Sequence, residues 1–183
     1  TLGITPNYAS TSYGYIKLKN SSMKNNLFEV ENFIEKPNKP KANKFLKSKE
    51  YLWNSGIFIG NSKMIENSIK AYAPQISKSC DIVFKNVTLS KSKNVFSFNL
   101  KDFKKIPSMS IDKSVIEKSN NIFCAHINCQ WNDVGSWDKY FECFPENKRS
   151  KVVQVKSKNN YIKSNKKLIA TVGIENLIVI DTN

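Results

Sequence analysis

The sequence lacks a long apolar run. No stretch of its 183 residues approaches the roughly 18 consecutive apolar residues of a membrane-spanning helix, and no basic segment leads into an apolar one at its start. We therefore predict no membrane partner. Apolar residues still make up 40% of the chain and aromatic residues 11%, which suffices for a packed core and excludes a disordered tail.

The sequence also lacks the cysteine and histidine spacings of a zinc site. Its four cysteines include no Cys-x-x-Cys pair, and His126 is its single histidine. Free thiols in a reducing compartment are the simplest interpretation, so we expect a cytoplasmic location. Cys124 and His126 share one face of a predicted strand and could form a nucleophilic pair, but we favour packing in the core.

Arginine is nearly absent from a strongly basic chain. Of the 29 basic residues behind the formal net charge of +14, only Arg149 is an arginine. Reading of base edges and bidentate binding of phosphate favour the planar guanidinium, and the lysines are spread along the chain. We therefore do not expect a nucleic-acid partner, although a basic nucleic-acid-binding domain stands as a third interpretation.

The order of the predicted elements indicates an α/β protein with a β tail. We predict strands at 1–5, 13–18, 27–34, 57–59 and 121–127, a turn at 20–26, and helices at 39–50, 62–73, 75–87, 108–118 and 136–144. From residue 152 onward, short strands follow one another at regular spacing, which indicates a coiled or helical all-β tail. The predicted domains are therefore 1–147 and 148–183.

The densest group of potential ligand-binding side chains lies at residues 131–137. Asp133 falls between a predicted strand and a helix that Ser136 could cap, and ligands bind at such places in α/β sheets. Its carboxylate could bind a divalent metal. An Asx turn between two tryptophans of the core is the alternative, and this stretch alone does not separate the two.

Three other stretches contain candidate ligands for a sugar phosphate. Gly14, inside a predicted strand, indicates either a close backbone approach or a β-bulge. Glu35 and Lys36 could accept hydroxyl protons and bind a phosphate, or form an exposed ion pair of little consequence. Asn54 offers a donor and an acceptor to a sugar hydroxyl, but it would equally suit a turn.

Six stretches, in this order, resemble the sugar-1-phosphate nucleotidyltransferases, and within them the bacterial mannose-1-phosphate guanylyltransferases. These stretches are 13–16, 33–37, 53–56, 110–112 with 117–118, 131–137, and 170–173 with 179–181. The resemblance implies part of a Rossmann-like mixed sheet with flanking helices, followed by a β-helix-like tail.

The resemblance also implies a role for each candidate residue. Gly14 would approach the sugar with its backbone, and Glu35 and Asn54 would bind sugar hydroxyls. Lys36 would meet the sugar phosphate, and Asp133 would bind a catalytic Mg²⁺; these two would be the catalytic residues. The implied reaction transfers GMP from GTP to mannose 1-phosphate, which gives GDP-mannose and pyrophosphate for nucleotide-sugar and surface polysaccharide synthesis.

The nucleotide-binding features of that family are missing from the sequence. The glycines stand singly at positions 3, 14, 56, 60, 135 and 173, so no glycine-rich loop is available for the nucleotide phosphates. We expect a carboxyl-side part of such an enzyme, truncated or encoded apart from its amino-terminal half, with little activity of its own. Its partner would be that half or a second copy. The alternative is an inactive remnant that serves as a binding or interaction module.

Overall fold

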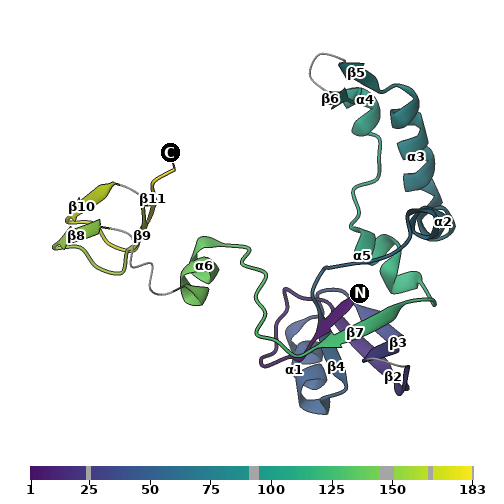
Figure 1. Ribbon diagram of the computed structural model, residues 1–183, viewed down its shortest axis with the longest axis horizontal. Helices are drawn as coiled ribbons and strands as arrows, with labels where there is room; N and C mark the ends of the chain where they lie inside the picture. Colours follow the sequence, from purple (N-terminus) through teal and green to yellow (C-terminus); the bar gives the residue numbers. More distant parts are fainter. Residues whose placement is uncertain (24–25, 91–94, 145–150, 165–166, 183) are drawn as a thin grey trace. The chain divides into compact units, whose positions relative to one another are not determined.

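The computed structural model describes residues 1–23, 26–90, 95–144, 151–164 and 167–182. The chain divides into two compact units, Thr1–Cys129 and Gln130–Asn183, and each is described by itself (Figure 1). The predicted domain boundary between residues 147 and 148 lies outside the described residues. The division after residue 129 assigns Asp133 to the second unit.

A mixed five-stranded sheet forms the centre of the first unit. Its strands, in spatial order, are β1 (Leu2–Ile4), β4 (Tyr51–Asn54), β2 (Tyr15–Met23), β3 (Leu27–Ile34) and β7 (Phe123–Ile127). Neighbours along this order are antiparallel. Strand β7 also pairs with β1, in parallel, so the sheet closes on itself. The predicted α/β class with a mixed sheet and flanking helices is confirmed.

Both faces of the sheet are covered at its middle. On one face Ile16, Phe33, Leu52 and Cys124 form the buried core cluster. On the other face Tyr15 is fully buried, and its ring lies 5.3 Å from that of Phe45, a residue of α1 (Lys39–Ser48). Alternate residues of one strand thus reach two different layers, which is why consecutive residues of β2 are both apolar and buried.

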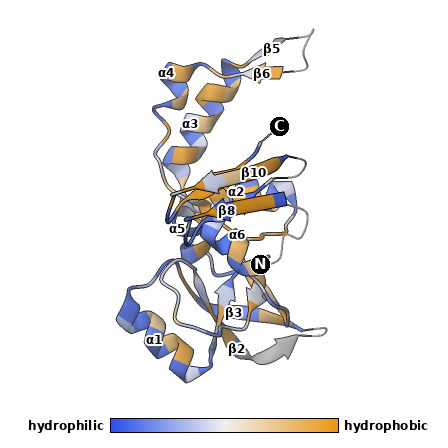
Figure 2. Cartoon of the chain, turned by 90° about the vertical axis from the view of Figure 1, so that its left-hand side faces the viewer, coloured by the Kyte–Doolittle hydropathy of each residue, from blue (hydrophilic) through white to orange (hydrophobic). Residues whose placement is uncertain are grey.

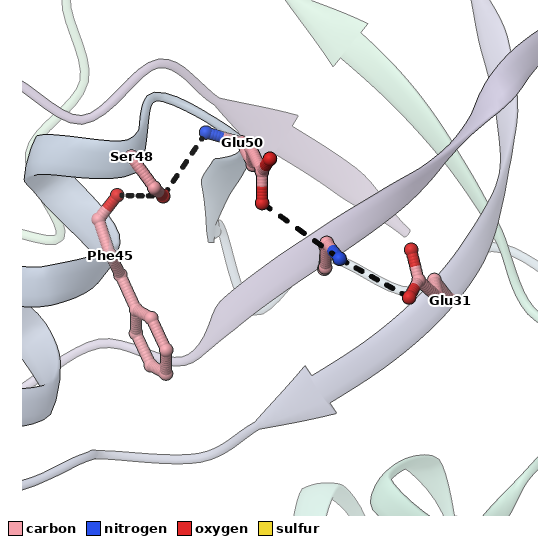
Figure 3. Close-up of polar contacts among 5 residues, drawn as sticks. Glu31, Phe45, Ser48 and Glu50 are labelled. Carbon is pink, nitrogen blue, oxygen red and sulfur yellow. Dashed lines mark hydrogen bonds and ion pairs between the residues drawn. The ribbon is translucent and has the colours of Figure 1, made fainter.

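Figure 3 shows how the end of α1 is connected to the β2–β3 hairpin. The Ser48 hydroxyl donates to the Phe45 carbonyl at 2.9 Å and accepts from the Glu50 backbone N–H at 3.4 Å. The Lys17 ammonium lies 3.2 Å from the Glu31 carboxylate and 3.8 Å from that of Glu50. The hydrogen bond with Glu31 raises the pKa of Lys17. Because both carboxylates are exposed, these ion pairs fix geometry more than they stabilise the fold.

The strand predicted at residues 57–59 is wrong. The strand is β4, and Ile57 and Ile59 beyond it are 48% and 78% exposed. Gly56 follows β4 with a φ of +75°, a left-handed conformation that breaks the regular strand, although the Ile57 carbonyl still accepts from the Leu2 N–H at 3.3 Å. The apolar run at 57–59 therefore does not form a buried strand. The turn predicted at 20–26 is also too long, because β2 continues to Met23.

The helices after β4 begin where the sequence places caps and prolines. They are α2 (Ser62–Tyr72), α3 (Pro74–Lys85), α4 (Leu100–Phe103), α5 (Ile111–Ser114) and the 3₁₀ helix η1 (Ile116–Lys118), with a hairpin of β5 (Thr88–Ser90) and β6 (Val95–Ser97) between α3 and α4. Asn61 caps α2 by accepting from the Lys63 N–H at 2.9 Å. Pro74 occupies the first turn of α3, where no intrahelical donor is needed. In the described part of the chain, no helix has the length and apolarity for a membrane crossing.

The second unit contains α6 (Trp137–Cys143) and four short strands in parallel pairs. β8 (Lys151–Val155) pairs with β10 (Leu168–Val172), and β9 (Tyr161–Lys163) pairs with β11 (Ile178–Ile180). Figure 2 shows the hydrophobic character of β8 and β10. Lys151 lies opposite Leu168 and Tyr161 opposite Ile178, so paired residues are 17 positions apart. The predicted β-helix-like tail is confirmed, with a 17-residue coil.

The backbone repeats with the same period. Lys156 and Gly173 both have a positive φ, of 49° and 67°, and so do Asn159 and Asn176, of 52° and 58°. The Asn160 amide donates to the Ile174 carbonyl at 2.9 Å and therefore links the two coils. Asparagine and glycine tolerate the left-handed conformation better than other residues do, so three of these corners fit their sequence and Lys156 is the exception. The two coils share too few identical residues for the repeat to be recognised from the sequence.

Candidate functional site

Three of the predicted sugar-binding residues meet at one edge of the sheet. Tyr15 of β2 lies opposite both Ile34 of β3 and Trp53 of β4. Both pairings are antiparallel, so one strand runs backward where its partner runs forward. The residue that precedes Tyr15 therefore lies beside the residue that follows Ile34 and the residue that follows Trp53. Those three residues are Gly14, Glu35 and Asn54, which are brought together by strand register alone.

Gly14 is required for space. A Cβ at this position would lie 2.6 Å from Glu35 Oε2 and 3.2 Å from Asn54 Cβ. The Gly14 carbonyl accepts from the Asn54 N–H at 2.8 Å, which fixes the two backbones against each other. The irregularities of β2 lie between Lys17 and Ser22, so the close approach that we predicted applies at Gly14 and the β-bulge does not.

Glu35 is held from its backbone and surrounded by charge. Its side chain is only 10% exposed, and its N–H donates to Glu117 Oε1 at 2.7 Å. Burial raises the pKa of the Glu35 carboxyl, the negative charges of Asp112 and Glu117 raise it further, and the Lys36 ammonium opposes them. A carboxylate in these surroundings is stabilised by hydrogen-bond donors, and sugar hydroxyls are such donors.

Asn54 is buried, and its amide is held at both ends. Its Nδ2 donates to Asp112 Oδ1 at 3.3 Å, and its Oδ1 accepts from the Thr1 hydroxyl at 2.8 Å. Asp112 and Thr1 were not among the predicted site residues. Asp112 belongs to one of the six family-like stretches, which is the one sequence signal that could have identified it.

Lys36 reaches the surface beside Glu35. Its side chain is 60% exposed, and its Nζ lies 3.7 Å from Glu35 Oε1. Its φ is 47°, a conformation that non-glycine residues seldom adopt and that is concentrated at functional sites. The following residue, Pro37, is buried and anchors this turn. The ammonium is therefore available to an anion next to the carboxylate.

Asp133 lies in the second unit, in the loop between β7 and α6, as predicted. The carboxylate is exposed, and its oxygen Oδ2 would lie 3.5 Å from a Cβ at Gly135. The Asx turn of this loop is formed by Asn132, whose Oδ1 accepts from the Val134 N–H at 2.9 Å. Trp137 is exposed, so the interpretation with both tryptophans in the core is wrong. Ser136 is the N-cap of α6, without a capping hydrogen bond from its side chain.

A metal at Asp133 would need further ligands. Magnesium takes six oxygen ligands, of which a single side chain supplies one or two. Nowhere in the described ranges do three or more His, Cys, Asp or Glu residues form a group that could hold a metal ion. The described residues therefore do not complete a Mg²⁺ site, and the predicted role of Asp133 stays a prediction.

Cys124 packs in the core, as we favoured, whereas His126 is half-buried. Cys124 is fully buried, and burial raises the pKa of its thiol to about 11, so it holds its proton at neutral pH. The Nε2 of His126 lies 2.9 Å from the Thr5 hydroxyl. All four cysteines are free.

Two family descriptions match this chain. Residues 1–150 match the nucleotidyl transferase family, and residues 150–183 match the MannoseP isomerase/GMP-like beta-helix domain. These two segments correspond to the α/β part and the coiled β tail of the structure.

Named relatives and solved structures agree with these matches. The mannose-1-phosphate guanylyltransferase of Klebsiella pneumoniae is 31% identical over 189 aligned positions, which cover all of this chain and 40% of that protein. The crystal structure titled mannose-1-phosphate geranyltransferase from Thermus thermophilus matches with a TM-score of 0.69 and 22% identity, over 100% of this chain and 52% of that one. The structure titled mannose-6-phosphate isomerase from Helicobacter pylori matches with a TM-score of 0.66 and 30% identity, over 73% and 51%. The chain thus spans about two fifths of the length of such curated relatives.

Proposed function

Because the chain belongs to the nucleotidyl transferase family, we propose that it binds the sugar phosphate in the transfer of GMP from GTP to mannose 1-phosphate. The products are GDP-mannose and pyrophosphate, for nucleotide-sugar and surface polysaccharide synthesis in the cytoplasm. The observation that carries the proposal is the convergence of Gly14, Glu35 and Asn54 at one edge of the sheet. The names of the relatives support mannose and guanine over other sugars and bases.

In the proposed complex, each residue of the cluster acts on one part of mannose 1-phosphate. Glu35 accepts hydrogen bonds from sugar hydroxyls, and Asn54 offers one amide proton and one lone pair beyond those used by Asp112 and Thr1. The Gly14 backbone forms the floor on which the sugar lies. The Lys36 ammonium pairs with the phosphate and lowers the repulsion between that phosphate and the approaching triphosphate.

The chemical step forms one P–O bond and breaks another. A phosphate oxygen of mannose 1-phosphate attacks the α-phosphorus of GTP, and the bond from that phosphorus to the bridging oxygen breaks, so that pyrophosphate leaves. The Lys36 ammonium contributes by charge and position. A Mg²⁺ ion, when bound, would neutralise the triphosphate, and Asp133 is the residue of this chain that would contact it.

The residues that would bind the nucleotide are expected to lie outside this sequence. No two of the chain's six glycines are adjacent or within three positions of each other, whereas a phosphate-binding loop uses several together. We propose that an amino-terminal nucleotide-binding half, on the same or a separate chain, supplies that loop.

Isothermal titration calorimetry with mannose 1-phosphate tests the sugar-binding role, and a pyrophosphate-release assay with GTP and Mg²⁺ tests turnover. We expect saturable binding of mannose 1-phosphate, weaker binding of free mannose, and little turnover by this chain alone. Full turnover by the isolated chain would contradict the assignment of the nucleotide site. Absence of any sugar-phosphate binding would favour the inactive interaction module instead.

A further inference from the structure

A short helical segment without an assigned role lies against the candidate site. Residues 110–118 contain α5 and η1, and Ser114 and Val115 at their junction are buried. Ile116 packs against the core cluster. The Ser110 hydroxyl caps the segment by accepting from a backbone N–H of α5. The middle of the segment is therefore anchored in the core, while its acidic side chains reach the sheet edge.

Two carboxylates of this segment each hold one residue of the candidate site. Asp112 Oδ1 accepts from the Asn54 side-chain amide at 3.3 Å. Glu117 Oε1 accepts from the Glu35 backbone N–H at 2.7 Å. Each bond joins positions far apart in the sequence, so neither is a product of local turn geometry. An ionised carboxylate can only accept hydrogen bonds, and each one therefore fixes the direction of its donor.

We propose that Asp112 is a positioning residue for the sugar and acts through the amide of Asn54. This inference rests on the proposed function. The two ends of an asparagine amide have almost the same shape, so packing alone does not choose between its two orientations. Asp112 favours one orientation of the Asn54 amide, because the opposite orientation would place the amide oxygen against the Asp112 carboxylate.

The other end of the amide agrees with this orientation. The Thr1 hydroxyl, which can donate, lies against Asn54 Oδ1 at 2.8 Å and donates to it. With both ends fixed, the remaining N–H and lone pair of Asn54 point in set directions before any ligand arrives. Such preorganisation increases affinity because the ordering cost is met during folding.

Asp112 has a second effect, on the charge of the site. The groups that set the charge environment of Glu35 are Asp112, Glu117 and Lys36, and the two carboxylates favour its protonated form. Removing the charge of Asp112 should therefore lower the pKa of Glu35 while it loosens Asn54. A residue that only stabilised the fold would not change the pH dependence of binding.

A double-mutant cycle in the full chain tests the proposal, with mannose 1-phosphate as the titrant in calorimetry. We expect Asp112→Asn to weaken binding about ten-fold, since the Asn54 amide loses its hydrogen bond to a charged group. At a pH where Glu35 is fully charged, adding it to Asn54→Ala should change the affinity by less than about two-fold, because Asp112 then acts only through Asn54. The pH at which binding is half lost should also be lower in Asp112→Asn. If the fold-losses of affinity in the two single variants multiplied in the double variant, Asp112 would contact the ligand itself, and the proposal would be overturned.

The matched control is Asp81→Asn, an exposed carboxylate of α3, which should leave binding and its pH dependence unchanged. Melting temperatures of all variants separate loss of folding from loss of positioning.

NMR of the ligand-free chain distinguishes failure of this inference from failure of the proposed function. The Asn54 side-chain proton that faces Asp112 should exchange slowly with solvent in the unmodified chain and faster in Asp112→Asn. Equal exchange rates in the two proteins would overturn the positioning role. A protected amide in a chain that does not bind mannose 1-phosphate would instead refute the proposed function and leave the Asp112–Asn54 geometry intact.

Discussion

The two regions that carry the predicted site residues are built in different ways. Gly14, Glu35 and Asn54 come from three segments of the first unit, and the register of three paired strands places them side by side. Asp133, in the second unit, lies in an exposed loop whose one turn is closed by its neighbour Asn132. The first region is specified by the fold of this chain, whereas a metal at the second would need ligands beyond those that the described residues provide.

The difference shows which kind of binding a single sheet of this chain can support. Binding of sugar hydroxyls needs fixed donors and acceptors at short range, and a paired sheet edge provides them. Binding of a metal and a triphosphate needs several oxygen ligands and a cradle of backbone amides. We therefore expect substitutions to affect sugar-phosphate binding strongly in the first region and hardly at all in the second.

The largest effect should come from Gly14→Ala. The added methyl group would meet Glu35 Oε2 at 2.6 Å and Asn54 Cβ at 3.2 Å, so the Glu35 carboxylate would have to leave its position in the candidate site. We expect mannose 1-phosphate binding to weaken about a hundred-fold and stability to fall by about 1–3 kcal/mol, measured by calorimetry and chemical denaturation. Gly60→Ala is the control, because its new methyl group would first meet the flexible end of Met64. If Gly14→Ala bound mannose 1-phosphate as well as the original chain, the Gly14 backbone would not lie close to the sugar.

Glu35→Gln should have the next largest effect and should separate binding from stability. Loss of the charged acceptor is expected to weaken sugar-phosphate binding about ten- to a hundred-fold. The pKa of Glu35 is raised, mainly by burial, which means that its charged form destabilises the folded chain. Because Glu35→Gln removes this charge, the melting temperature at neutral pH should rise. A variant that bound as well as the original chain would show that Glu35 does not contact the ligand.

The pH dependence of binding should follow Glu35. Only its charged form accepts two hydroxyl protons, and its pKa is raised by burial and by Asp112. As pH falls, binding should therefore begin to weaken above the range in which an ordinary glutamate titrates. The phosphate of the ligand also titrates, at about pH 6, so the profile of Glu35→Gln gives the ligand contribution to be subtracted. Identical profiles for the two proteins would contradict this assignment.

Asp133→Asn should have the smallest effect on this chain alone. Because Asp133 belongs to the nucleotide and metal side of the proposed reaction, mannose 1-phosphate affinity should change by less than about two-fold, with or without Mg²⁺. In a complemented enzyme with the nucleotide-binding half, the same substitution should abolish turnover. A large loss of sugar-phosphate affinity in the isolated chain would show that Asp133 takes part in sugar-phosphate binding, and would contradict the distinction between the two regions.

Much of the fold could be read from the sequence, because most elements begin at marked residues. Pro74 starts α3, Asn61 and Ser110 are caps, and the alternation of β3 gives its bounds as the structure has them. The strand predicted at residues 57–59 failed, because an apolar run does not show whether a neighbouring strand is available to pair with it. Closure of the sheet by β7 depends on pairing over more than 100 positions, which local pattern cannot show.

The candidate site was predictable in its residues but not in its supports. Family resemblance pointed to Glu35 and Asn54, and the strand register brought them together. The resemblance marked the stretch that contains Asp112, but not its contact with Asn54, because those side chains are 58 positions apart in the sequence. Nor could the sequence show that Asp133 belongs to a different unit from the sugar-binding residues.

The central claim is that Gly14, Glu35, Lys36 and Asn54 form one sugar-phosphate site in this chain. Titration of the ¹⁵N-labelled chain with mannose 1-phosphate, followed by two-dimensional NMR, tests it most directly. We expect saturable changes in the backbone amide chemical shifts of these four residues and their strand neighbours, and no change in those of the Asp133 loop. Saturable shifts confined to other residues, or no shifts at all, would contradict it.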